Sequence, residues 1–237
     1  MTIREIGRPG FRYRTDFERP AQPIIDAFKE LMQQTGCLTG NVGDCLGRGA
    51  GVSSDIKGLS HGMKMVGPAL TVNVPPTDNL MIHKALHMIQ PGDVLVIDAG
   101  GNHDWALLGI LMVSIAAKHG AAGIIVDGCI RDATEIRDLG FPVFASGISP
   151  NGPFKEGPGE INYPINCGGQ VVHPGDMVVA DDDGVVIAKR EFAVQNTIDR
   201  IKDVFAKEKK RMAEIESGLT LKPGMQEIFT KKNLEWV

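Results

Sequence analysis

The hydrophobic pattern changes its period along the chain, from helical spacing near the start to strand spacing further on. The range 21–34 repeats apolar residues at intervals of three and four and is followed by Gly36, which predicts an amphipathic helix ending there. The range 67–75 alternates apolar and polar positions like a strand. The range 78–89 predicts a second helix, with Asp78 as its N-terminal cap.

The middle of the chain alternates strands with helices. The range 90–101 is a turn, an apolar strand and a second turn. The range 105–119 is apolar almost all round, which predicts a helix buried on most of its sides. A strand at 123–128, a short helix at 133–139 and a strand at 142–147 follow. This succession predicts an α/β fold with a partly parallel sheet.

The range 173–190 contains two β-rich runs joined by Asp181-Asp182-Asp183-Gly184. Asp-Gly is typical of a tight hairpin turn. A calcium-binding loop is the less favoured alternative, because the spaced ligand pattern and the closing glutamate are missing.

One long helix is predicted from Glu191 to Gly218. Its apolar stripe advances in steps of four and three and consists of Val194, Ile198, Ile201, Phe205, Met212 and Ile215. The missing position of this stripe is Glu208, which lies either at a solvated edge or against another chain. The basic run 207–211 is interpreted as the solvated face of the same helix.

The composition describes an ordinary globular protein of 237 residues, 43% hydrophobic and 23% charged. A net charge of −4 gives no general attraction to nucleic acid or an anionic membrane. The first 20 residues carry charges where a signal peptide needs apolar residues, so we expect a cytoplasmic protein. The four cysteines form no CxxC or Cys/His cluster and are expected to be reduced and buried.

Common nucleotide and nucleophile motifs are absent from the sequence. There is no GxGxxG after a strand, no GxxxxGK[ST] and no GxSxG. The remaining candidate is Arg131-Asp132, which follows the strand at 123–128, at the edge of an α/β sheet where ligands gather. Asp132 either caps the next helix while Arg131 forms an ion pair, or the two bind a carboxylate and a hard cation such as Mg²⁺.

Five segments of the sequence resemble the RraA-like family, which includes the class II 4-hydroxy-4-methyl-2-oxoglutarate and 4-carboxy-4-hydroxy-2-oxoadipate aldolases. These segments are PGDVLVIDAGG, Ala-Leu-Leu-Gly at 106–109, GAAGIIVDGCIRDATEIRDLGFPVFASG, Lys155-Glu156 before GEINYPI, and PGDMVVADDDGVVI. The most specific is DGCIRD. The resemblance implies a single domain over 1–237, an αββα-type sandwich similar to the swivelling phosphohistidine domain, with an N-terminal arm at 1–20. The C-terminal helix and tail at 191–237 would contribute to oligomer contacts.

The resemblance also implies roles for individual residues. Asp132 would be the ligand of a Mg²⁺ or Mn²⁺ ion, and Arg131 would hold the carboxylate and keto end of a pyruvoyl group. The substrate-binding backbone amides would be those of Gly109, Ile110, Leu111 and Met112, since free N–H groups at a helix start bind anions. Lys155 matches a lysine near the substrate, although spacing alone also allows an exposed loop lysine. A catalytic glutamate from a neighbouring subunit would be Glu208, with Glu214 and Glu216 as further candidates.

The implied reaction is the cleavage of a 4-hydroxy-2-oxo acid to pyruvate, with oxaloacetate decarboxylation as a related activity through the same enolate. The resemblance further implies a homotrimer or homohexamer with sites at subunit interfaces. Neither nucleic acid nor membrane is an expected partner.

The sequence departs from the aldolase pattern at Ile110, where the family carries an acid. Asp104 and His103 could substitute for this acid if the predicted helix extended back to them. Two alternatives therefore stay open: a different 2-oxo acid substrate or step, and a non-catalytic protein-binding regulator.

Overall fold

The computed structural model describes residues 3–234 and divides into two compact units, 1–198 and 199–237. The elements are β1 (Glu5–Arg8), β2 (Phe11–Arg14), α1 (Gln22–Thr35), α2 (Thr39–Cys45), β3 (Lys57–Gly58), β4 (Met65–Asn73), α3 (Leu80–Leu86), β5 (Val94–Leu108), α4 (Ile110–Lys118), β6 (Gly123–Ile130), α5 (Ala133–Leu139), β7 (Val143–Ile148), β8 (Gly159–Ile161), β9 (Ile165–Cys167), β10 (Gln170–Val172), β11 (Met177–Asp181), β12 (Gly184–Ala188), the 3₁₀ helix η1 (Arg190–Phe192), α6 (Gln195–Glu216) and α7 (Met225–Lys231). The parts of the predicted arm and tail that fall on residues 1–2 and 235–237 lie outside the described residues. Within the described range no helix is both long and apolar enough to cross a bilayer.

The centre of the first unit is a parallel sheet in the order β4-β5-β6-β7. Leu95 of β5 lies between Leu70 of β4 and Ile124 of β6, and Ile124 pairs in turn with Val143 of β7. The antiparallel hairpin β11–β12 joins this sheet through β4. The predicted partly parallel sheet is therefore confirmed.

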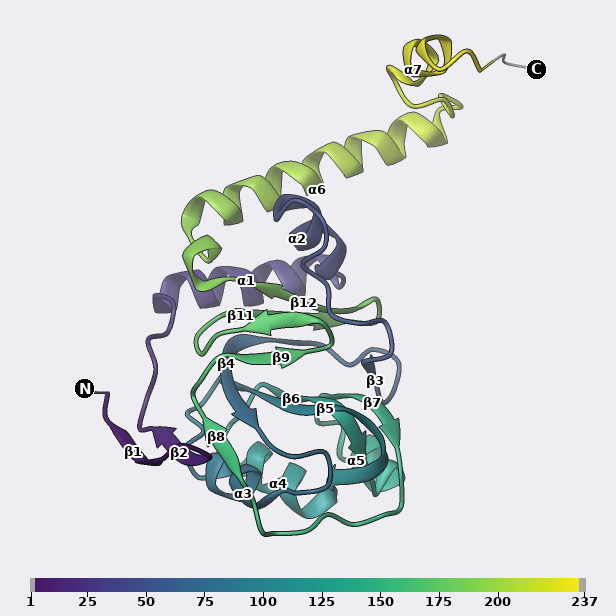
Figure 1. Cartoon of the computed structure of the whole chain (residues 1–237). Coiled ribbons are helices and arrows are strands. Elements are labelled where there is room, and N and C mark those ends of the chain that lie inside the picture. Colours follow the sequence, from purple (N-terminus) through teal and green to yellow (C-terminus); the bar gives the residue numbers. More distant parts are fainter. Residues whose placement is uncertain (1–2, 235–237) are drawn as a thin grey trace. The chain divides into compact units, whose positions relative to one another are not determined.

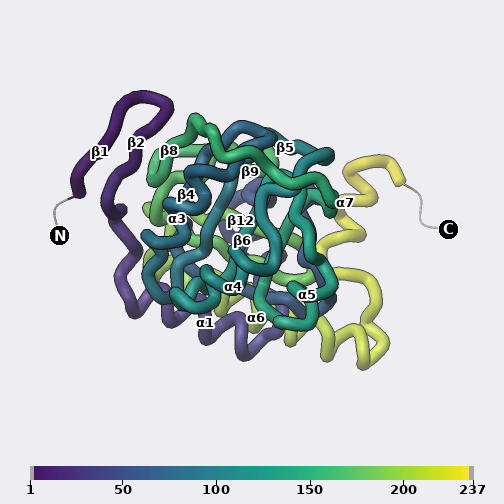
Figure 2. Tube along the Cα trace, turned by 90° about the horizontal axis from the view of Figure 1, so that it is seen from below, coloured from purple at the N-terminus to yellow at the C-terminus, as the bar shows by residue number. Residues whose placement is uncertain are grey.

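Both faces of the parallel sheet are buried, which explains its almost continuous apolar runs. Along β5, Leu95 and Ile97 belong to one core cluster, whereas Val94 and Val96 belong to another. Helices α3, α4 and α5 lie side by side over the first face (Figures 1 and 2). Strands β9, β11 and β12 cover the second face, and α1 lies beyond them (Figure 1). These four layers confirm the predicted αββα sandwich.

The predicted helix at 105–119 is wrong in its first part. Residues 105–108 continue β5, where Ala106 pairs with Cys129 and Leu108 with Ile130 after register shifts. Helix α4 begins only at Ile110. The apolar side chains of 106–108 suit either structure, and pairing with the end of β6 decides between them. The helix is also less enclosed than predicted, since the side chain of Leu111 is 78% exposed.

Two helix boundaries and the exposure of one cysteine also differ from the predictions. Helix α3 covers only Leu80–Leu86 and begins after Asn79, although Asp78 still accepts a 2.8 Å hydrogen bond from the Leu80 amide. The C-terminal helix is not continuous from Glu191, because η1 precedes α6. Cys37 is exposed, whereas the other three cysteines are buried as predicted.

The N-terminal arm is integrated into the sheet from residue 5 onward. Strands β1 and β2 form a hairpin, and β2 pairs in parallel with β8. Arg12 of β2 donates a 2.7 Å hydrogen bond to Glu160 of β8. The N-terminal arm therefore forms one edge of the sheet in the first unit.

Candidate functional site

A cavity of about 280 Å³ lies where β6 ends and α4 begins. Five segments contribute to it: the start of α3, the end of β5, the start of α4, the residues directly after β6, and the loop between β7 and β8. The lining residues are Asn79, His83, Leu107, Leu108, Gly109, Leu111, Met112, Arg131, Asp132, Pro153 and Lys155. The structure therefore brings together most of the candidates from the sequence, which come from positions up to 46 residues apart in the chain (109 to 155).

Asp132 has a left-handed backbone with φ 57°, which is uncommon for a residue other than glycine. Its side chain does not cap α5, so the helix-cap interpretation of Asp132 is wrong. Instead, Oδ2 accepts a 3.0 Å hydrogen bond from the Ile110 amide at the start of α4. This bond links the residues after β6 to the start of α4 and holds the carboxylate at the cavity.

Gly109 is required by the close approach of that carboxylate. A Cβ atom at position 109 would lie 2.2 Å from Asp132 Oδ2, so any larger residue would displace the carboxylate. The backbone of Gly109 is extended, and the constraint is therefore space rather than backbone conformation.

Arg131 lies at the mouth of the same cavity. Its amide donates a 3.0 Å hydrogen bond to the Leu108 carbonyl, which ties the end of β6 to the end of β5. Its side chain is 48% exposed, and Nε lies 3.9 Å from Asp132 Oδ2. The guanidinium is consequently only loosely paired and retains donors for an anionic ligand.

The amides at the start of α4 are not equivalent. The Ile110 amide donates to Asp132, and the Met112 amide donates a 3.1 Å bond to the Gly109 carbonyl. The Leu111 amide lies in the first turn of the helix, where an N–H group has no helical carbonyl four residues earlier to donate to. Among these positions, Leu111 thus offers the clearest anion-binding donor.

Lys155 is positioned by hydrogen bonds between its loop and the residues directly before α3. The Phe154 amide donates to the Thr77 carbonyl at 2.8 Å, and the Asn79 amide donates to the Phe154 carbonyl at 3.1 Å. The Glu156 amide donates to Asp78 Oδ2 at 2.5 Å. These three bonds hold Lys155 beside the cavity, although its side chain remains exposed.

The sequence interpretation missed Asn79 and His83 on the α3 side of the cavity. Asn79 Oδ1 and His83 Nε2 are buried and have no hydrogen-bond partner within residues 3–234. An unpaired buried polar atom costs about 1–3 kcal/mol, so each calls for an explanation. Their spacing of four residues, which places both on one face of a helix, is the signal that the sequence offered.

Burial lowers the pKa of His83 below its ordinary value, and the positive charges of Lys155 and His87 act in the same direction. These effects favour the neutral imidazole over the charged one. A neutral imidazole has one donor nitrogen and one acceptor nitrogen.

The other polar candidates lie outside this cavity. Asp104 and His103 precede α4 within the irregular part of β5, so α4 does not carry them toward the cavity. The backbone carbonyl of Asp104 accepts bonds from Ser149 and Asn151. Glu208 is exposed and belongs to the second unit, described separately from the cavity. The same unit contains Glu214, which forms a 3.0 Å ion pair with Arg211, and the exposed Glu216.

The side chain of Ile110 packs against the apolar core instead of lining the cavity. At this position the chain contributes an amide donor and no acidic group.

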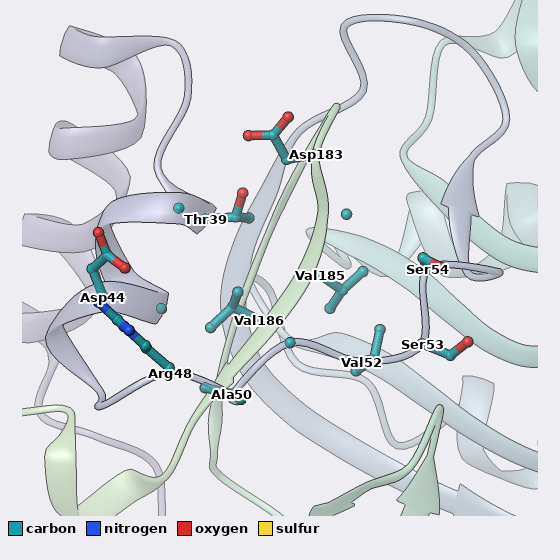
Figure 3. A pocket seen from close by; sticks show the side chains of 15 residues that line it. Thr39, Asp44, Arg48, Ala50, Val52, Ser53, Ser54, Asp183, Val185 and Val186 are labelled. Atoms are coloured by element: carbon teal, nitrogen blue, oxygen red, sulfur yellow. The ribbon is translucent and has the colours of Figure 1, made fainter. Parts of the chain in front are cut away.

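A second cavity, of about 360 Å³, lies along β12 (Figure 3). Thr39, Asp44 and Arg48 lie on one side of the strand, and Ser53 and Ser54 lie on the other (Figure 3). Asp183 of the predicted hairpin turn lines it, whereas none of the residues predicted to bind a 2-oxo acid or its metal does.

Cys37, Asp181 and Asp183 lie close enough to share a metal ion. However, Asp181 Oδ2 already accepts bonds from the amides of Leu38 and Thr39, and Oδ1 accepts from Asp183 and from the Thr39 hydroxyl. Partial desolvation of the otherwise exposed Cys37 and the neighbouring carboxylates raise the pKa of its thiol to about 11, so the thiol stays protonated. Asp181 closes the hairpin, as a turn residue would, and binds the start of α2.

Comparisons with known proteins relate this arrangement to one family. Residues 24–187 match the model of the RraA-like family, described as Aldolase/RraA. A protein of Halalkalibacterium halodurans, provisionally named a 4-hydroxy-4-methyl-2-oxoglutarate aldolase, is 39% identical over 74% of this chain and 80% of its own length. A protein of Arabidopsis thaliana with a similar provisional name is 40% identical over 54% of this chain and 76% of its own.

A solved structure supports the same relationship. RraAS2 of Streptomyces coelicolor, described as an unusual member of the RNase ES inhibitor RraA protein family, superimposes with a TM-score of 0.71 and 31% identity. The match covers 83% of this chain and 98% of that protein. The chain therefore belongs to the RraA-like family.

Proposed function

We propose that this chain is a divalent-metal-dependent lyase that cleaves a 4-hydroxy-2-oxo acid, of the 4-hydroxy-4-methyl-2-oxoglutarate type, to pyruvate. The observation that carries the proposal is the convergence of the Asp132 carboxylate, the Arg131 guanidinium and the first turn of α4 on one cavity. The names of the relatives support the same reaction.

The residues of the cavity fit a Mg²⁺ or Mn²⁺ ion held by one protein carboxylate. Only Oδ2 of the Asp132 carboxylate accepts the hydrogen bond from the Ile110 amide. Hard cations of this kind keep water molecules at most of their coordination positions. Asp132 would hold the ion. A bound ion supplies Lewis-acid polarisation of carbonyl and carboxylate oxygens.

The chain's own groups would position the substrate. Arg131 would bind the carboxylate and keto oxygens, and the Leu111 amide would donate to the carboxylate. Cleavage breaks the C3–C4 bond, removes the proton of the C4 hydroxyl and leaves negative charge on the pyruvate fragment, which then accepts a proton at C3. The fixed positive charge of Arg131 stabilises that negative charge. Oxaloacetate decarboxylation would use the same groups.

The absence of an acidic side chain at Ile110 is compatible with this chemistry only if another group receives the hydroxyl proton. If none does, the chain acts on another 2-oxo acid or catalyses another step. The relative described among RNase ES inhibitors motivates the non-catalytic alternative, in which the chain binds a protein.

A coupled assay of pyruvate release tests the proposal. With Mg²⁺ present, the purified chain should release pyruvate from 4-hydroxy-2-oxo acids and from oxaloacetate, and a chelator should reduce both rates at least about 100-fold. Restoring Mg²⁺ should restore both. Release that the chelator leaves unchanged would contradict metal dependence, and no release from any of these acids would contradict the lyase and leave the two alternatives, another 2-oxo acid reaction and protein binding.

We further propose that the active form is a homotrimer or homohexamer in which Glu208 completes the site of a neighbouring subunit. Met212 and Ile215, on the same helix, are 56% and 41% exposed and could be covered by another copy. Leu111 at the cavity is also exposed and apolar.

Subunit mixing tests this assembly. Glu208→Gln should lower pyruvate release at least about tenfold, since a general base or its equivalent contributes about 10²–10⁴-fold. Co-expression of Glu208→Gln with Asp132→Asn should recover part of the activity, because some sites would then hold both native groups. The control Glu227→Gln, an exposed change on α7, should be neutral. A monomer in light scattering, or no recovery in the mixture, would overturn the shared site.

A further inference from the structure

Two polar atoms on the α3 side of the cavity lack partners, and the lyase proposal leaves both unused. Asn79 is only 3% exposed, and its Oδ1 finds no donor within residues 3–234. His83 Nε2, four residues later in the chain, is also buried and has no hydrogen-bond partner within residues 3–234. The two side chains share one face of the helix turn, which is closed by a 3.2 Å bond from the His83 amide to the Asn79 carbonyl.

The orientation of the Asn79 carboxamide is determined by its other neighbours. Nδ2 donates a 2.8 Å hydrogen bond to the Leu107 carbonyl and lies 3.4 Å from Met112 Sδ. A carbonyl accepts and cannot donate, so the reversed carboxamide would place two acceptors together. The unpaired atom of Asn79 is therefore an acceptor that requires a donor.

The cavity thus has two chemically different parts. Arg131, Lys155 and the Leu111 amide are donors and suit the anionic end of a ligand. Asn79 offers an acceptor, and the neutral imidazole of His83 offers either an acceptor or a donor. A group that both donates and accepts hydrogen bonds, as a hydroxyl does, would satisfy both atoms.

We propose that Asn79 and His83 bind the C4 hydroxyl group of the substrate and so determine the selectivity of the site for hydroxylated 2-oxo acids. The assignment rests on the proposed lyase function and names the part of the substrate that these residues contact. A volume of about 280 Å³ is near the lower limit of ligand cavities, roughly 300–1,000 Å³, and suits a small acid.

Two reactions of the same enzyme distinguish this role from a structural one. Cleavage of a 4-hydroxy-2-oxo acid requires the C4 hydroxyl, whereas oxaloacetate has no such hydroxyl and yields the same pyruvate fragment. His83→Phe keeps a ring of similar size without its nitrogens. It should lower kcat/KM for cleavage about 10- to 100-fold and change oxaloacetate decarboxylation less than about threefold.

Two further variants guard against a loss that comes from misfolding. His83→Gln, which retains hydrogen-bonding groups, should recover part of the cleavage activity. Asn79→Ser should show the same selective loss as His83→Phe. The matched control is His87→Phe, the same change on an exposed residue that follows α3 and does not line the cavity, and both reactions should keep their rates.

The outcomes separate the two proposals. A His83→Phe variant that loses both reactions equally, or neither, would overturn the hydroxyl assignment while the lyase function stands. A wild-type chain that releases pyruvate from neither acid would overturn the lyase function, and the hydroxyl assignment with it.

Discussion

Replacing Asp132 with asparagine should reduce metal-dependent pyruvate release about 1,000-fold, since a Lewis acid supplies several kcal/mol of stabilisation to the developing charge. The introduced asparagine would still adopt the left-handed backbone, which this residue type tolerates, and its carbonyl oxygen could still accept the bond from the Ile110 amide. The fold should therefore be retained while the anionic ligand is lost. Steady-state assays at several Mg²⁺ concentrations would measure the effect.

The control for this variant is Asp138→Asn, an exposed acid on the neighbouring helix α5. It should leave the rate and the melting temperature unchanged. Calorimetry with Mn²⁺ adds a readout that does not depend on turnover: the wild-type chain should bind the ion and the Asp132→Asn variant should not. Equal ion binding by both would show that Asp132 is not the ligand.

Replacing Arg131 with lysine should lower kcat/KM about 100-fold for both cleavage and decarboxylation. Lysine preserves the charge but loses the planar fork that binds two oxygens of a 2-oxo acid at once. Since the guanidinium is half exposed and only loosely paired with Asp132, little in the fold depends on it. We therefore expect the loss in activity without a loss in stability.

Arg137→Lys provides the comparison for this variant, because Arg137 lies on α5 and donates a 2.9 Å bond to the Leu59 carbonyl away from the cavity. Its kinetics should match those of the native chain. Pyruvate, used as a product inhibitor, offers a separate measurement, and its inhibition constant should rise in Arg131→Lys alone. If Arg131→Lys retained native kinetics and native inhibition by pyruvate, Arg131 would not hold the carboxylate.

Much of the fold was predictable because local patterns and long-range packing agree. The strand at 123–128 is apolar on both faces, and the structure buries both of its faces between helices and a second sheet layer. The strand predicted at 67–75 from its alternating pattern is buried on both faces as well. The first helix ends at Gly36, whose left-handed backbone closes it. Where local pattern and packing disagree, as at 105–108, pairing between β5 and β6 prevails.

The α/β class, the hairpin at Asp181 and the candidate pair Arg131-Asp132 could be predicted from the sequence alone. These follow from apolar periodicity, turn chemistry and motif, which are local properties of the chain. The folded structure was needed to show that the Ile110 amide holds the Asp132 side chain, which leaves α5 without a side-chain cap, and that Asn79 and His83 line the same cavity. These features depend on segments far apart in the sequence that meet where β6 ends, and no local pattern records which polar groups remain unpaired there.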